Sequence, residues 1–206
     1  HLYMLTNELP NHDDIVSMFS RNDTLYLGRW FLFITSKLGS RFHTPWVSGA
    51  IALLALSMSS VLVVRALHIK RTTWIILACV LCVTNPVISN SLAYMFMADG
   101  FFISLLLAVG GMAVTDRYRF GWIAGGIFLG LSLGIYQTYI FTAVALFGIR
   151  YLTLLVSKDM DDKALLKKLA QYALALALGI VVYMVGLKAM LAYRGVTLST
   201  YKGVST

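Results

Sequence analysis

Two adjacent carboxylates, Asp13 and Asp14, are the residues of this chain best suited to chemistry. Carboxylates this close repel each other, which can raise the pKa of one of them toward a value useful for a general base. Such a base could accept the proton of a hydroxyl nucleophile, and carboxylate oxygens also suit Mg²⁺ or Mn²⁺. The sequence does not decide whether a metal is required. The alternative is a solvated helix start, with Asp13 as N-cap and Asp14 in the first turn.

Other polar residues lie beside hydrophobic stretches. Arg29 could bind a phosphate through a bidentate guanidinium, or it could anchor the chain at a membrane surface by snorkelling. Asp99 begins a hydrophobic stretch, so it is either a functional ionisable group or a helix cap. Tyr136 and Gln137 interrupt a long apolar run, where they could bind substrate or form an interfacial turn.

The composition sets the class of protein. The 206 residues are 59% hydrophobic and 13% charged, about half the charged fraction of a soluble domain, which is roughly 25%. The hydrophobic stretches approach the length of membrane spans, and only helices or closed barrels satisfy the backbone in lipid. Barrel strands would alternate apolar and polar residues, which these do not. The prediction is an all-α, polytopic transmembrane bundle whose net charge of +8 reflects loop residues and not nucleic-acid binding.

Three regions are expected. Residues 1–44 would form an outer loop with an interfacial amphipathic helix at 28–42, residues 45–190 a bundle of about six spans, and residues 191–206 an outer tail. Asn85-Pro86 would break the second span, and residues 158–168 would form a charged, solvated loop. Because the chain begins with His1 and ends soon after a hydrophobic stretch, we expect a fragment of a longer protein. The expected spans are 45–67, 72–94, 98–114, two within 121–156, and 169–190.

Loop charges predict the orientation. One side receives ten of the 17 lysines and arginines and the other receives seven, and the more basic side is expected to be cytoplasmic. The Asp13-Asp14 pair, Asn85-Pro86, Asp99 and Tyr136-Gln137 then all face the opposite, outer side. We find no nucleotide-binding loop, nucleophile elbow or zinc motif. Gly126 and Gly130 have the small-xxx-small spacing of closely packed membrane helices.

Several segments, in this order, resemble one family. The segment Asn11-His12-Asp13-Asp14-Ile15 followed by Gly28-Arg29-Trp30 resembles the first outer loop of the Gtr-type bacterial glucosyltransferases, membrane enzymes of the GT-C superfamily that modify the O-antigen of lipopolysaccharide. Ala98-Asp99-Gly100-Phe101-Phe102 and Leu133-Gly134-Ile135-Tyr136-Gln137 are similar to two further family segments. Trp30 departs from the pattern, since the family usually has a small residue or proline there.

The resemblance implies a GT-C-like fold and a reaction. A hexose, expected to be glucose, would move from a polyprenyl-phosphate carrier such as undecaprenyl-phosphate glucose to a surface glycan such as O-antigen, on the periplasmic side of a bacterial inner membrane. Asp13 would be the base, Asp14 its partner or a metal ligand, and Arg29 the ligand of the phosphate. Trp30 and Tyr136 would stack on sugar rings. The substrate-binding set is completed by Asp99 and Gln137.

Two other functions stay open on the sequence alone. A membrane transporter or a lipid-linked sugar flippase would place ionisable residues near mid-membrane and would show broken helices in repeated halves. We find one such break, at Asn85-Pro86, and no internal repeat. A non-catalytic scaffold would tolerate simultaneous neutralisation of Asp13, Asp14, Arg29 and Asp99.

Overall fold

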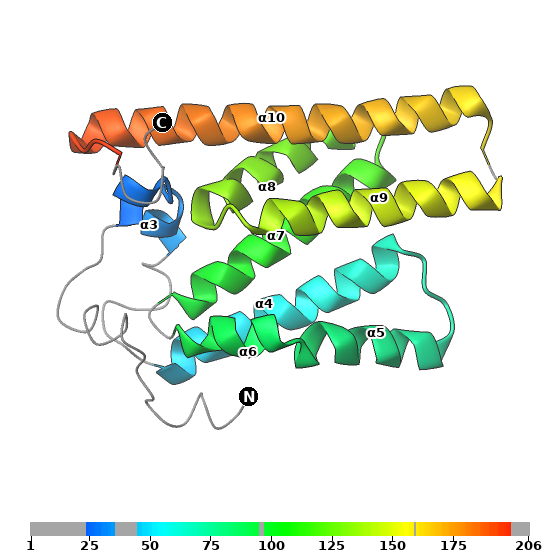
Figure 1. Ribbon diagram of the computed structural model, residues 1–206, viewed down its shortest axis with the longest axis horizontal. Helices are drawn as coiled ribbons and strands as arrows, with labels where there is room; N and C mark the ends of the chain where they lie inside the picture. Colours follow the sequence, from blue (N-terminus) through cyan, green and yellow to red (C-terminus); the bar gives the residue numbers. More distant parts are fainter. Residues whose placement is uncertain (1–23, 36–44, 95–96, 159, 199–206) are drawn as a thin grey trace.

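The computed structural model describes residues 24–35, 45–94, 97–158 and 160–198. Asp13 and Asp14 lie outside these residues. All regular elements of the described part are helical, and the longer helices lie roughly along one common direction (Figure 1). The elements are η1 (Thr24–Leu27), α3 (Leu32–Thr35), α4 (Pro45–Ala66), α5 (Thr72–Thr84), α6 (Pro86–Ala93), α7 (Ala98–Arg117), α8 (Gly121–Ile135), α9 (Tyr139–Ser157) and α10 (Asp162–Arg194).

The helix ends follow local sequence signals. Asn85 is the N-cap of α6, and its side-chain oxygen accepts a hydrogen bond of 2.9 Å from the Val87 amide. Pro86 cannot donate the backbone hydrogen bond that would continue α5, so α5 and α6 meet at an angle of 41°. Asp161 caps α10 at the Ala164 amide, and Gly195 ends α10 in the left-handed conformation.

Helices α7, α8 and α10 pack closely because glycines line their contacts. A Cβ atom at Gly126 would lie 2.8 Å from Cβ of Leu178, and one at Gly130 would lie 2.6 Å from Cβ of Val182. Both glycines of the small-xxx-small pattern therefore face α10, as this spacing predicts. Across the α7–α8 contact, the buried hydroxyls of Ser104 and Ser132 bond each other's backbone carbonyls, at 3.0 and 2.8 Å.

The described helices support a membrane protein. Four of them, α4, α7, α9 and α10, are long and apolar enough to cross a membrane, and the bent pair α5 and α6 would give a fifth crossing. Helix α8 has 15 residues, or about 22 Å at 1.5 Å per residue, which is shorter than a hydrocarbon core of roughly 30 Å. With α8 these elements match the six expected segments, and the number of true crossings stays a prediction.

Three expectations differ from the structure. The helix expected at 28–42 begins only at Leu32, because residues 28–31 form a turn around Gly28, whose φ is +80°; residues 36–44 lie outside the described part. The expected loop 158–168 is wrong in its second half, since α10 already begins at Asp162. The junction between α5 and α6 also lies part-way along the bundle and not at its outer end, where we expected Asn85-Pro86 (Figure 1).

An ion cluster ties three helices together. Asp116, near the end of α7, pairs with Arg150 of α9 at 3.1 Å and with Lys168 of α10 at 3.2 Å. The Tyr172 hydroxyl also donates to this carboxylate, and the Tyr172 ring stacks on Phe147 with centroids 4.4 Å apart. The cluster thus fixes α7, α9 and α10 against one another.

Candidate substrate site at the α3 end of the bundle

We call the end of the bundle where η1 and α3 pack the α3 end. The segment from Thr24 to Thr35 is held there by backbone and side-chain contacts. The Phe31 amide donates a hydrogen bond of 2.8 Å to the carbonyl of Gly134, the second-last residue of α8. Leu32 is buried against α7, since a Cβ at Gly100 would clash with its side chain. The segment therefore closes over helix ends that come much later in the chain.

Arg29 lies in this segment over an aromatic ring. Its guanidinium carbon is 4.9 Å from the centre of the Tyr136 ring, a cation–π contact. Its Nη1 lies 3.8 Å from Sδ of Met97, a weak acceptor. No carboxylate of the described residues forms an ion pair with Arg29.

Burial lowers the pKa of the Arg29 guanidinium from its ordinary value, and Tyr136 and Tyr26 act in the opposite direction. An arginine nevertheless stays charged at neutral pH. Among the described residues, only a ring and a thioether lie beside the N–H groups of this half-buried cation. Such a group favours an anionic ligand, because burial of an unpaired charge is costly.

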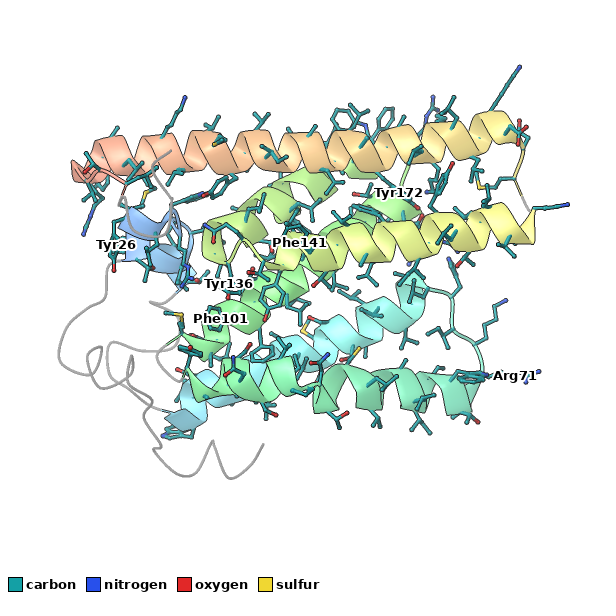
Figure 2. The ribbon with its side chains drawn as sticks, viewed as in Figure 1. Tyr26, Arg71, Phe101, Tyr136, Phe141 and Tyr172 are labelled. Atoms are coloured by element: carbon teal, nitrogen blue, oxygen red, sulfur yellow. The ribbon has the colours of Figure 1, made fainter. Side chains whose placement is uncertain are left out.

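Tyr136 belongs to a row of aromatic rings. The centroids of Phe101 and Tyr136 are 4.6 Å apart, those of Tyr136 and Tyr139 are 5.6 Å apart, and Tyr94 packs edge-on against Phe101. Figure 2 shows Tyr26, Tyr136 and Phe101 at the α3 end, whereas Arg71 lies at the opposite end. Tyr136 is half-buried among these rings and Arg29, so they already occupy part of the ring surface that was predicted to stack on a sugar.

Gln137 joins three elements. Its Nε2 lies 3.4 Å from the hydroxyl of Tyr183 on α10 and 3.5 Å from the carbonyl of Leu27 at the end of η1. A Cβ at Gly28 would lie 2.7 Å from the Tyr183 hydroxyl and 3.3 Å from Nε2 of Gln137. Only glycine suits this position, both for space and for its positive φ.

Trp30 packs into the interior of the bundle. Its side chain is buried against two glycines, Gly134 of α8 and Gly186 of α10, where added Cβ atoms would clash with the indole. Its Nε1 is buried without a hydrogen-bond partner among the described residues. This placement makes Trp30 a packing anchor of the segment, and its predicted stacking on a sugar would require the segment to move.

Asp99 lies at the same end, two residues after Met97, the residue that Arg29 contacts. It is 2% exposed, in the first turn of α7. One carboxylate oxygen accepts a hydrogen bond of 2.8 Å from the Gly100 amide. The described part shows no ion pair or hydrogen bond between Asp99 and Arg29. A carboxylate at the N-terminus of a helix is also stabilised by the helix dipole, so the capping alternative for Asp99 stays open.

The structure therefore brings together Arg29, Tyr136 and Gln137 from two segments more than 100 residues apart. Asp13 and Asp14 lie outside the described residues, so their predicted roles stay predictions. Among the residues that the structure places, no group of three or more His, Cys, Asp or Glu could hold a metal ion. Sequence reasoning missed Tyr183 and the aromatic partners of Tyr136, because an aromatic residue in an apolar run carries no local signal of a site.

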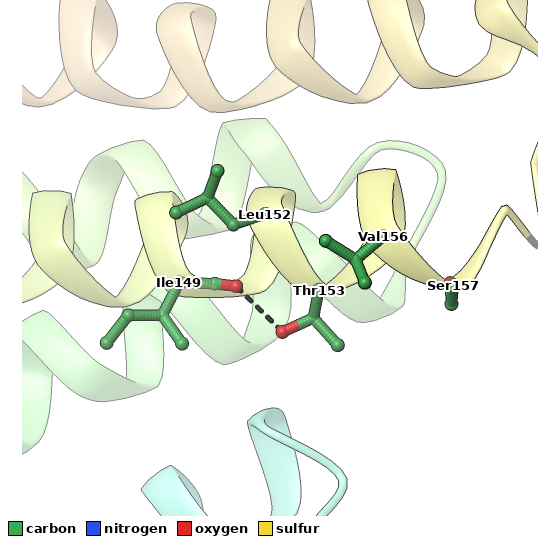
Figure 3. A pocket seen from close by; sticks show the side chains of 5 residues that line it. All are labelled: Ile149, Leu152, Thr153, Val156 and Ser157. Atoms are coloured by element: carbon green, nitrogen blue, oxygen red, sulfur yellow. Dashed lines mark hydrogen bonds between the residues drawn. The ribbon is translucent and has the colours of Figure 1, made fainter.

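A shallow apolar pocket lies away from this cluster. It runs along one side of α9 and is lined by Ile149, Leu152, Thr153, Val156 and Ser157 (Figure 3). The Thr153 hydroxyl donates to the Ile149 carbonyl within the helix, at 2.8 Å. Its polarity is thereby satisfied locally, so the surface is one that lipid can cover. We do not include it in the candidate site.

The fold and this site define a polytopic helical membrane protein with a cationic, aromatic cluster at one end. Residues 2–206 match the family described as glucosyl transferase GtrII, and the chain belongs to this family. Comparison with curated proteins and with solved structures gives no match. The family identifies the chain as a glucosyltransferase, with a sugar donor and an acceptor as its substrates.

Proposed function

We propose that this glucosyltransferase is of GT-C type and moves glucose from a polyprenyl-phosphate carrier to a cell-surface glycan such as O-antigen. The reaction would take place at the periplasmic face of a bacterial inner membrane. The observation that carries the proposal is the Arg29 guanidinium, which is half-buried over Tyr136 at one end of the bundle, without an ion-pair partner among the described carboxylates. A lipid phosphate has the charge and the position at a bilayer boundary that fit such a group.

The proposed steps balance charge and atoms. The acceptor hydroxyl attacks the anomeric carbon of glucose and gives its proton to the Asp13 carboxylate. The bond from the anomeric carbon to the phosphate oxygen breaks, and its electron pair leaves with the lipid phosphate. Arg29 would stabilise the negative charge that grows on this leaving group. Asp14 would hold the proton-accepting carboxylate in place or bind Mg²⁺ or Mn²⁺.

The proposal is tested by supplying the proposed donor, undecaprenyl-phosphate glucose. Membranes of bacteria that carry the acceptor glycan, expressing the full-length protein, would be supplied with radiolabelled undecaprenyl-phosphate glucose, and label entering the glycan would be measured. Loss of a charge-assisted contact costs about 1.5–3 kcal/mol, so Arg29→Ala should raise the donor KM by roughly 10- to 150-fold. Asp13→Asn should lower kcat by about 10²–10⁴. Arg71→Ala, an exposed arginine at the opposite end, is the matched control.

The outcomes separate the alternatives. An unchanged donor KM in Arg29→Ala would reject Arg29 as the phosphate ligand. Full transfer by Asp13→Asn would reject Asp13 as the base. Well-expressed wild-type protein that transfers no label would reject this donor. Uptake of the labelled donor into proteoliposomes would then support the transporter or flippase instead.

A further inference from the structure

Tyr183 places a hydroxyl group on a face of α10 that is otherwise apolar. The neighbouring sequence from Leu178 to Leu187 is LGIVVYMVGL, and Tyr183 is half-buried within it. Its hydroxyl lies near both the Gly28 backbone and the loop that follows α8, because a Cβ at Gly28 would lie 2.7 Å from it and Gln137 donates to it at 3.4 Å. The hydroxyl therefore joins three parts of the chain.

These contacts are long for hydrogen bonds, so they add little stability. The Gln137 amide reaches Tyr183 at 3.4 Å and the Leu27 carbonyl at 3.5 Å, whereas most N–H···O bonds measure about 2.9–3.0 Å. Even an ideal neutral hydrogen bond contributes only about 0.5–1.5 kcal/mol net. We therefore expect the Tyr183 hydroxyl to affect the placement of nearby residues and not the stability of the fold.

The residue whose position this contact can influence is Arg29, which lies between Gly28 and the packing anchor Trp30. Gly28 and Gln137 both lie beside the Tyr183 hydroxyl. Their chain neighbours, Arg29 and Tyr136, form the cation–π contact of 4.9 Å. A shift of the Gly28 backbone would move the Cα atom of Arg29, one peptide unit away, and small displacements of a binding group are costly in catalysis.

We propose that Tyr183 is a positioning residue, which sets the Arg29 guanidinium for the phosphate of the donor through Gln137 and the Gly28 turn. This inference rests on the proposed function, since it takes Arg29 as the phosphate ligand. This role requires no contact between Tyr183 and the substrate. The Tyr183 hydroxyl supports the backbone at Gly28, and the next residue, Arg29, is the one that would bind the phosphate.

The test compares donor KM in four full-length proteins with radiolabelled undecaprenyl-phosphate glucose: wild type, Tyr183→Phe, Arg29→Ala and the double variant. Tyr183→Phe should raise the donor KM by about 2- to 3-fold, the lower end of what one neutral hydrogen bond contributes, with kcat and the melting temperature nearly unchanged. In the Arg29→Ala background the same substitution should have no further effect. Tyr193→Phe is the matched control, since Tyr193 lies on the same helix and is 82% exposed.

Two results would overturn the positioning role while leaving the proposed function in place. One is an unchanged KM in Tyr183→Phe together with a raised KM in Arg29→Ala. The other is a Tyr183→Phe effect that persists in the Arg29→Ala background, which would mean a general structural role. An unchanged KM in Arg29→Ala would instead reject the proposed function and, with it, the role of Tyr183.

Discussion

Removing the Asp116 carboxylate should destabilise the bundle strongly. The side chain of Asp116 is only 8% exposed, and its two cationic partners, Arg150 and Lys168, are 15% and 17% exposed. Asp116→Ala would leave both cations without a counter-charge and would remove the acceptor of the Tyr172 hydroxyl. We therefore expect a loss of packing between α7, α9 and α10, which these residues connect.

The size of the effect follows from burial. Breaking a buried ion pair by removing one partner costs about 3–5 kcal/mol. Arg150 and Lys168 keep some access to water, so the lower end of this range applies, about 3 kcal/mol. At 1.36 kcal/mol for each factor of ten, the ratio of folded to unfolded protein should fall roughly 150-fold.

The free energy of unfolding would be measured on the purified full-length protein in detergent, by denaturant titration followed through tryptophan fluorescence. Asp162→Ala, an exposed carboxylate on α10, should lose less than about 1 kcal/mol. Replacing Asp116, Arg150 and Lys168 together by apolar residues should recover much of the loss, since no charge is then buried alone. An Asp116→Ala variant within about 0.5 kcal/mol of wild type would refute the reasoning.

Two further predictions concern helix packing and helix ends. Gly130→Val should destabilise the α8–α10 contact by about 1–3 kcal/mol, because its Cβ would lie 2.6 Å from that of Val182. Gly148→Ala is the control, since no atom lies within 4 Å of a Cβ at Gly148. Equal melting temperatures for the two variants would contradict the predicted clash at Gly130. Asn85→Ala removes the acceptor that caps the Val87 amide and should lower the free energy of unfolding by about 1 kcal/mol. Asn85→Ser keeps a side-chain oxygen and should retain most of the stability. Equal stability of the two variants would argue against the cap.

Most helix boundaries were predictable because their causes are local. Pro45 begins α4, the Asn85-Pro86 pair divides α5 from α6, and the chain turns at Tyr136 and Gln137 between α8 and α9. Each of these signals lies within a few residues of the boundary that it sets. The start of α10 was missed because the charges after Asp161 were interpreted as a loop, although Asp161 is itself a good N-cap.

Contacts between distant residues had no comparable signal. Asp116 was predicted only as the end of a span, since nothing in its neighbourhood indicates that Arg150 and Lys168 pair with it. For the site, Arg29 and Gln137 were identified as candidates from the sequence, but their meeting at the Gly28 turn depends on how α10 packs. The burial of Trp30 also depends on Gly186, which lies far along the chain.

The packing of Trp30 has a consequence for the order in which the protein is made. Trp30 is synthesised well before Gly186 of α10, against which its indole packs and which comes more than 150 residues later. At about 5–20 residues per second, the ribosome needs roughly 8–30 s to reach that helix. During this interval the segment that carries Arg29 has no finished surface on which to dock. The segment that carries Arg29 can therefore dock fully only after α10 has been made, and the enzyme cannot act before this helix is in place.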